Sequence, residues 1–186
     1  MNLFSSIVMA ATVTLTLHNG LALAQTGVAK ITNPLLIRSS LQYQAPPFNL
    51  IKDEHFKPAF EQALKVHGAE IDHIANNTAP ASFQNTVLAL EISGMDLNRA
   101  SLVFYNLTSA NTNPVLQKIE EEYAPIFSAH NDKIYLNDKI YKRIKSLDMK
   151  TLTGEDKRLT EYYLQQFELA GANLSAADKE KMKAIN

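Results

Sequence analysis

The sequence contains no cysteine and no tryptophan, and it has only six glycines in 186 residues. Without cysteine the chain forms neither disulfide bonds nor thiolate metal sites, a pattern compatible with a reducing compartment or with a helical protein large enough to need no cross-links. The rest of the composition is ordinary, with 46% hydrophobic residues, 20% charged residues and a formal net charge of −1. The sequence has no basic patch, which excludes nucleic acid as an expected partner.

Charged residues are also absent from the first segment, Met1–Ala24. Its centre, Ile7–Leu17, is apolar, and it ends in Ala22-Leu23-Ala24, the small-x-small pattern that signal peptidases cut. We interpret this segment as a secretory signal peptide, although it lacks the lysine or arginine typical of the first few positions. A buried first helix is the alternative, and a membrane span is disfavoured because the apolar run is shorter than the roughly 20 residues required. Export predicts a periplasmic or secreted bacterial protein that has no membrane contact once the leader is removed.

Two segments, His55–Glu61 and Phe83–Gly94, carry the clearest helical pattern. In both of them apolar residues recur at helical spacing, and Ser82 is a suitable N-cap for the second helix. The short polar loop Asn76–Ala81 between them predicts two antiparallel helices. The positions expected to be buried are Phe56, Phe60, Leu64, Ile71 and Ile74 in the first helix, and Phe83, Val87 and Leu90 in the second.

Further helices are predicted to begin after Asn113, Asn137, Thr153 and Ser175, all residue types that cap helices. Pro125 is expected to bend or break the first of these helices, and Gly171 to end the third. No run outside the leader alternates like a strand, so we predict an all-α fold. The residues expected to face inward are Leu116, Ile119, Tyr123, Ile126 and His130, then Ile140, Ile144 and Leu147, then Leu159, Tyr162, Tyr163 and Phe167, and finally Met182 and Ile185.

Taken in order and at these separations, the segments resemble the thimet-oligopeptidase-like zinc metallopeptidases. The resemblance covers the chain after the leader and favours the branch that releases dipeptides, mainly through Tyr43–Phe48 and Ser128–Asp132. The other segments that carry it are Asn33–Leu36, His55–Glu61, Phe83–Gly94, Val103–Thr112, Ser128–Asn137 and Phe167–Ser175.

The resemblance implies a fold, a cofactor and a substrate class for the full-length enzyme. Such enzymes are almost wholly helical, with two lobes around a deep channel, and their catalytic zinc is held by a His-Glu-x-x-His helix. The peptidyl-dipeptidases among them release dipeptides from the C-termini of oligopeptides. We therefore expect an all-α helical bundle that forms the N-terminal lobe of a larger peptidase. Residues 1–24 would be the signal peptide, 25–52 an extended N-terminal segment, and 53–186 a helical region that ends before the catalytic domain.

The zinc motif itself is missing from this sequence, which contains no His-Glu pair. No two of the histidines are four residues apart, and His67 and His73 fall on different faces of a helix. We therefore expect no catalytic, cofactor-binding or metal-ligating residue in this chain, with no zinc bound by it and the metal site in a C-terminal catalytic region. The alternative is a site assembled across helices from His55, His67 and His130, although lone helical histidines are more often packing or surface residues.

Three other groups of residues could be mistaken for sites. The acidic triple Glu120–Glu122 is more typical of a solvated helix face than of a metal site. Asp132, Asn137 and Asp138 offer oxygen ligands, but the glycine and the closing glutamate of a calcium loop are missing. The third group, which a helical core or its rim explains better than peptide stacking, is Tyr135, Tyr141, Tyr162 and Tyr163.

The last predicted helix starts at Ser175 and has no stop signal after it, which favours a fragment of a longer enzyme. The apolar faces of 82–107 and 175–186 would then lack their packing partners and leave a hydrophobic patch exposed. The competing hypothesis is a stand-alone secreted helical module that binds peptides or a peptidase without cleaving anything.

Overall fold

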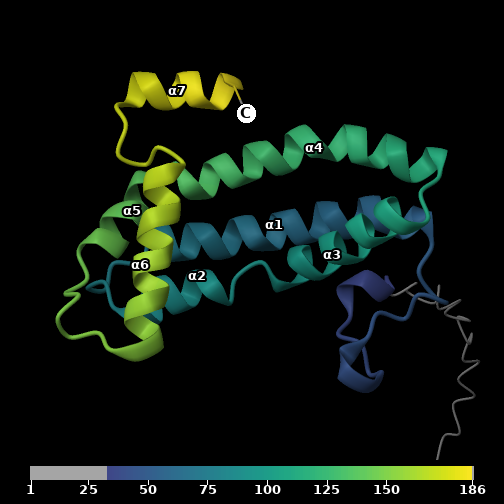
Figure 1. Ribbon diagram of the computed structural model, residues 1–186, viewed down its shortest axis with the longest axis horizontal. Helices are drawn as coiled ribbons and strands as arrows, with labels where there is room; N and C mark the ends of the chain where they lie inside the picture. Colours follow the sequence, from purple (N-terminus) through teal and green to yellow (C-terminus); the bar gives the residue numbers. More distant parts are fainter. Residues whose placement is uncertain (1–32, 186) are drawn as a thin grey trace, which may run out of the picture. The chain divides into compact units, whose positions relative to one another are not determined.

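Helices supply nearly all the regular structure of the computed structural model, which describes residues 33–185 (Figure 1). No strand occurs within those residues, which confirms the predicted all-α fold class. None of the helices in this described range is both long and apolar enough to cross a membrane. The predicted signal peptide and the first residues of the predicted extended segment lie outside the described residues.

The main helices follow one another through short connections. The described chain begins with 3₁₀ turns at Pro34–Leu36, Gln42–Gln44 and Asp53–His55. A π-helical segment, Phe83–Leu88, continues directly into α2. The α-helices are α1 (Phe56–Ala75), α2 (Ala89–Glu91), α3 (Met95–Ala110), α4 (Pro114–Tyr135), α5 (Asp138–Lys145), α6 (Gly154–Leu169) and α7 (Ala176–Ile185).

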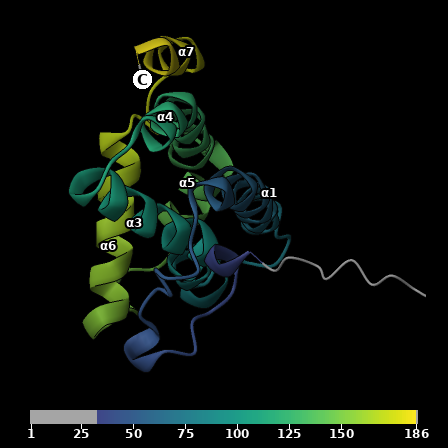
Figure 2. The same ribbon diagram turned by 90° about the vertical axis from the view of Figure 1, so that its right-hand side faces the viewer.

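Helix α1 lies between two neighbours that run its full length. The chain turns back after α1, so α2 and α3 lie antiparallel to it, as predicted, and α4 follows its other side (Figures 1 and 2). Helix α6 crosses the bundle at the end where α1 and α4 finish, and α5 packs against α6 there. Short connections between long helices thus produce an antiparallel layout, with α1 in the centre.

The buried side chains form two hydrophobic clusters, one towards each end of α1. The first, here called the Phe60 core, contains Leu35, Phe56, Ala59, Phe60, Ala100, Val103, Phe104, Leu116, Ile119 and Tyr123. The second, the Phe167 core, contains Ile71, Ile74, Ala75, Phe83, Val87, Leu90, Ile134, Ile140, Tyr141, Ile144, Phe167 and Ala172. Helices α1 and α4 contribute to both cores, so the two ends of the bundle share these long helices.

Most of the predicted helix boundaries are confirmed by cap geometry. The side-chain oxygens of Ser82, Asn113, Asn137 and Ser175 accept hydrogen bonds from backbone N–H groups in the first turns of their helices. Helix α6 begins after Thr153 as predicted, but the Thr153 side chain makes no capping hydrogen bond. The end of α6 is a Schellman motif, in which the N–H of Ala172 donates to the Phe167 carbonyl at 2.8 Å, with Gly171 at a φ of +97°.

Two of the predicted inward positions are wrong, and of the two effects predicted for Pro125, a bend or a break, the break does not occur. Helix α4 continues unbroken through Pro125, an exposed residue whose missing N–H leaves only a solvent-side carbonyl without its partner. Ile126 is 43% exposed and Phe127 packs against the Phe60 core instead, because the inward position after Tyr123 is four residues on, not three. Tyr162 is likewise 51% exposed.

The cap of α4 offers a direct test of local helix chemistry. Asn113 Oδ1 accepts from the N–H groups of Val115 and Leu116 at 2.9 and 3.0 Å, and Asn113 Nδ2 donates to Asp53 at 2.9 Å. We expect Asn113→Ala to lower the free energy of unfolding by about 1–2 kcal/mol, because both N–H groups lose their acceptor. Urea denaturation measures the loss. The control Asn106→Ala, at an exposed position inside α3, should change stability by less than about 0.5 kcal/mol.

Candidate functional site

A group of hydrogen-bonded residues lies midway along α1, between the Phe60 core and the Phe167 core. It consists of His67 on α1, His130 on α4, and Ser93 and Gly94 in the turn between α2 and α3. Neither hydrophobic cluster includes any of these residues, although both clusters draw on the helices that carry them. We call this group the seam.

The seam is held by a directional chain of hydrogen bonds. Ser93 Oγ donates its single hydrogen to the Leu90 carbonyl at 2.8 Å. The 3.2 Å contact between Ser93 Oγ and His67 Nε2 must therefore be donated by the histidine. His67 Nδ1 is then an acceptor, and it receives the proton of His130 Nε2 across 3.0 Å. His67 is thus neutral, with its proton on Nε2, and His130 carries a proton on its own Nε2.

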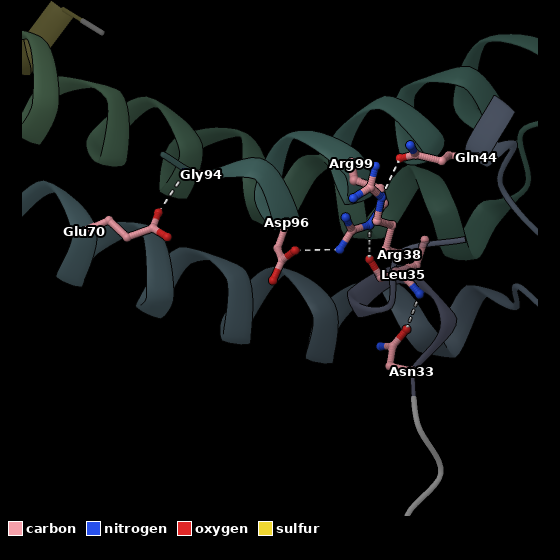
Figure 3. A network of polar contacts seen from close by, with 8 residues as sticks. All are labelled: Asn33, Leu35, Arg38, Gln44, Glu70, Gly94, Asp96 and Arg99. Carbon is pink, nitrogen blue, oxygen red and sulfur yellow. Dashed lines mark hydrogen bonds and ion pairs between the residues drawn. The ribbon is translucent and has the colours of Figure 1, made fainter. Parts of the chain in front are cut away.

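Gly94 brings the turn close to the ring of His67. Its φ is +66°, and a Cβ placed there would lie 2.7 Å from ring atoms of His67. The Gly94 N–H donates to Glu70 Oε2 on α1 at 2.8 Å, as Figure 3 shows. Because a side chain at residue 94 would displace the imidazole, glycine is what allows α3 to begin against α1.

A second polar network fixes the segment that precedes α1 (Figure 3). The Arg99 guanidinium on α3 donates to the Leu35 carbonyl at 3.1 Å and pairs with Asp96 at 2.5 Å. Asn33 caps the turn that carries Leu35, whose side chain is 1% exposed within the Phe60 core. This network is structural, since every polar group in it is matched to a neighbour of the same fold.

Burial lowers the pKa of both histidines in the seam. Desolvation lowers the pKa of His67 from its usual 6.5, although Glu70 acts in the opposite direction. Desolvation, the neighbouring His67 and then Lys133 lower the pKa of His130. The folded protein therefore prefers this pair uncharged, as a chain with neutral rings requires.

These shifts predict a loss of stability in mild acid. Between the lowered folded pKa values and 6.5, the unfolded chain binds more protons, so the free energy of unfolding falls as the pH decreases. The histidine contribution is complete above pH 6.5 and is lost as the pH falls through the folded values. Urea titrations between pH 8 and 4.5 measure it, and a His67→Gln/His130→Gln variant should show a flatter profile over this range. An unchanged profile in that variant would contradict the assignment.

The seam does not fit a zinc ion of the catalytic kind. Its two facing nitrogens are engaged with each other, and within residues 33–185 no group of three histidine, cysteine or acidic side chains is placed to hold a metal. The structure brings together two members of the considered His55, His67 and His130 set. His55 lies elsewhere, where its Nδ1 accepts from the Lys52 N–H at 3.1 Å. Ser93 is not poised as a nucleophile either, because the imidazole nitrogen that contacts it donates a proton and cannot remove one.

The other candidate groups have structural roles. Glu122 of the acidic triple is paired with Lys57 on α1. The stretch that the sequence analysis rejected as a calcium loop is largely helical, since Asp132 lies within α4 and Asn137 caps α5. Asp138 pairs with Lys179 of α7. Among the four tyrosines, Tyr141 is buried, Tyr135 and Tyr163 line the rim of the Phe167 core, and Tyr163 donates to Glu91 at 2.8 Å.

Comparison with known proteins places these helices among bacterial peptidases, although no protein-family model matches the chain. The sequence is 41% identical to dipeptidyl carboxypeptidase of Salmonella typhimurium over 159 residues and 40% identical to that of Escherichia coli over 158. Oligopeptidase A of Salmonella typhimurium is 30% identical over 159 residues. Each match covers 83% of this chain but 23% of the relative, so the chain spans about a quarter of the length of these proteins.

The chain is therefore homologous to dipeptidyl carboxypeptidase, with oligopeptidase A as a more distant relative. This confirms the resemblance found in the sequence and is consistent with an N-terminal part of dipeptidyl carboxypeptidase.

Proposed function

We propose that this chain is the non-catalytic helical part of an exported, zinc-dependent peptidyl-dipeptidase that releases dipeptides from the C-termini of oligopeptides. The observation that carries the proposal is the 41% identity to dipeptidyl carboxypeptidase in a sequence without a His-Glu pair. The matched residues make up 23% of that relative, which leaves ample sequence to supply zinc ligands and a general base elsewhere. In this proposal the described helices shape and support the enzyme, and they bind no zinc themselves.

Exposed apolar side chains support a packing partner outside these helices. Segment 88–105 carries Ile92, Met95 and Leu102 at 58%, 65% and 64% exposure, with Leu88 and Tyr105 also exposed. Large apolar residues gathered on one helical segment are typical of a surface that packs against further protein. The apolar face that the sequence pattern defined in this region, with Phe83, Val87 and Leu90, is buried in the Phe167 core, so these exposed residues form a second apolar surface.

A chimeric enzyme tests the proposed role. Residues 33–185 would replace the homologous residues of Escherichia coli dipeptidyl carboxypeptidase, and dipeptide release from a blocked tripeptide would be measured. We expect the chimera to retain zinc and most of the activity of its parent. A folded chimera that binds zinc but releases no dipeptide would contradict the proposal.

The exposed apolar residues of segment 88–105 supply a test variant for this chimera, and an exposed polar position supplies its control. Leu102→Glu should reduce the thermal stability or activity of the chimera, because a carboxylate would be buried against the rest of the enzyme. It should leave the stability of the isolated chain nearly unchanged, since Leu102 is 64% exposed there. Gln117→Glu, which introduces the same charge at an exposed position on α4, is the control and should be nearly neutral in both settings.

Two further observations address the enzyme and its export. The nucleotide sequence after the Asn186 codon should remain open and encode a His-Glu-x-x-His motif, whereas a genuine stop codon would favour the stand-alone module. N-terminal sequencing of the mature protein from a bacterial periplasmic fraction should begin at Gln25. A cytoplasmic protein that begins at Met1 would contradict export.

A further inference from the structure

We infer that the hydrogen-bonded chain His130–His67–Ser93 is a proton-operated latch, which ties α4 and the α2–α3 turn to α1 at the seam. The inference rests on the placement of this chain between the Phe60 core and the Phe167 core. It does not depend on the proposed peptidase role.

Packing at the seam is thin on both sides of the histidine pair. A groove of about 860 Å³ runs between α1 and α4, lined by small residues that include Gly68, Ala69 and Ala129 together with His130. A Cβ added at Gly68 would meet no atom within 4 Å. On the other side a cavity of about 230 Å³ borders His67 and Ser93. Beside these openings, the hydrogen bonds of the seam add a polar link between α1, α4 and the α2–α3 turn.

Each half of the bundle, by contrast, is firmly packed on its own. In the Phe60 core, the ring of Phe60 lies 5.1 Å from that of Tyr123 and 5.0 Å from that of Phe127, which ties α1 to α4 there. In the Phe167 core, Ile71 and Ile74 of α1 share a cluster with Ile134 of α4. Loss of the latch would therefore loosen the contacts between α1, α4 and the α2–α3 turn at the seam and leave both cores intact.

The chemistry of the pair makes the latch respond to two protons. One proton is accepted without loss of a bond, because His130 can be charged at Nδ1 while its Nε2–H still donates to His67 Nδ1. A second proton must enter at His67 Nδ1, and two N–H groups then face each other across a 3.0 Å contact. That arrangement has no acceptor and places two positive charges side by side, so the contact must open.

Charged and titratable groups on every neighbouring helix face this pair and modulate the response. Glu70 favours a charged His67, whereas Lys133 disfavours a charged His130. Glu70 is also bonded to the Gly94 N–H, which keeps it near His67 while the contact is closed. The groups lining the adjoining groove and cavities are Lys65, Glu70 and Asp72 on α1, Glu91 on α2, Asp96 on α3, Lys133 and Tyr135 on α4, and Tyr163 on α6.

Proton linkage predicts how steeply the equilibrium constant for opening of the latch depends on pH. The equilibrium constant for opening rises about tenfold per pH unit for each proton that the open state binds in excess. The open state can bind two protons and the closed state one, so opening should rise about tenfold per pH unit where His130 is already charged, and up to about a hundredfold where the closed pair is still uncharged. A single titrating histidine would give at most a tenfold rise.

Because the sequence contains no cysteine, two introduced cysteines can be spin-labelled without background, and the distance between them can be measured across the seam. Spin labels on Gln62→Cys in α1 and Asn131→Cys in α4, exposed positions on the two helices that the histidine contact joins, report the separation of these helices. We expect one narrow distance distribution at pH 7.5 and a broad or second distribution near pH 5, with helical circular dichroism retained. One unchanged distribution at both pH values would overturn the inference.

The variant His130→Gln separates the latch from general effects of acid. Glutamine can donate an N–H to His67 Nδ1 but cannot take up a proton, so its distance distribution should change little between pH 7.5 and 5. An acid-induced change as large as that of the parent protein would overturn the inference.

If this variant fails to fold, the parent protein still decides the question. Hydrogen exchange of the Gly94 amide, corrected for its intrinsic pH dependence, should accelerate as the pH falls. An exchange rate with no pH dependence beyond the intrinsic one would overturn the latch.

Discussion

Phe60→Ala should lower the free energy of unfolding by about 3–5 kcal/mol, the usual cost of deleting a fully enclosed phenylalanine. The Phe60 side chain is 0% exposed. Its ring centroid lies 5.0–6.0 Å from those of Phe56, Phe104, Tyr123 and Phe127, which come from three helices. Removal of the ring leaves a cavity that these rigid neighbours cannot fill by small shifts. Denaturant unfolding of the purified chain, monitored by circular dichroism, measures the loss.

The matched control for Phe60 is Phe48→Ala, which deletes the same group at a position that is 47% exposed. Its loss should be about 1 kcal/mol or less, because about half of that surface already meets water. Equal losses for the two variants would contradict the placement of Phe60 at the centre of its core.

Gly94→Ala should cost about 2–4 kcal/mol, since strain at positive φ and overpacking against His67 both contribute. The φ of +66° is unfavourable for alanine, and the new Cβ would lie 2.7 Å from the imidazole of His67. Gly154→Ala isolates the backbone contribution, because Gly154 has a φ of +54° and no atom within 4 Å of an added Cβ. That control should lose only about 1 kcal/mol.

A double variant tests whether the difference in stability loss between Gly94→Ala and Gly154→Ala comes from the contact with His67. His67→Ala removes the ring that meets the new Cβ, so the losses of Gly94→Ala and His67→Ala should be less than additive. Additive losses, or equal losses for Gly94→Ala and Gly154→Ala, would contradict the close approach of the turn to α1.

Local chemistry explains why so much of the helical layout could be predicted from the sequence. Caps such as Ser82 and Asn113 act within their own first turn, so their spacing predicts where each helix begins. The burial of Phe56, Phe60 and Ile71 follows from a pattern repeated over several turns of α1. The predicted resemblance to the peptidases is also confirmed by the relatives.

The errors and omissions arise where a result depends on more than one helix. Helical spacing allows either Ile126 or Phe127 to follow Tyr123 inward, and packing against Phe60 selects Phe127. The seam was not predicted, because His67 and His130 are 63 residues apart and no periodicity joins them. Gly94 was recognised only as the end of a segment, whereas its positive φ and its contact with His67 depend on the fold. The signal peptide, export and zinc dependence remain predictions.

The central claim is that this chain supplies structure to a peptidase and no catalysis of its own. The most direct test is to measure, on the purified chain, its zinc content and its release of dipeptide from a blocked tripeptide. The account predicts a folded helical protein without bound zinc and without detectable release. Stoichiometric zinc together with turnover would contradict it.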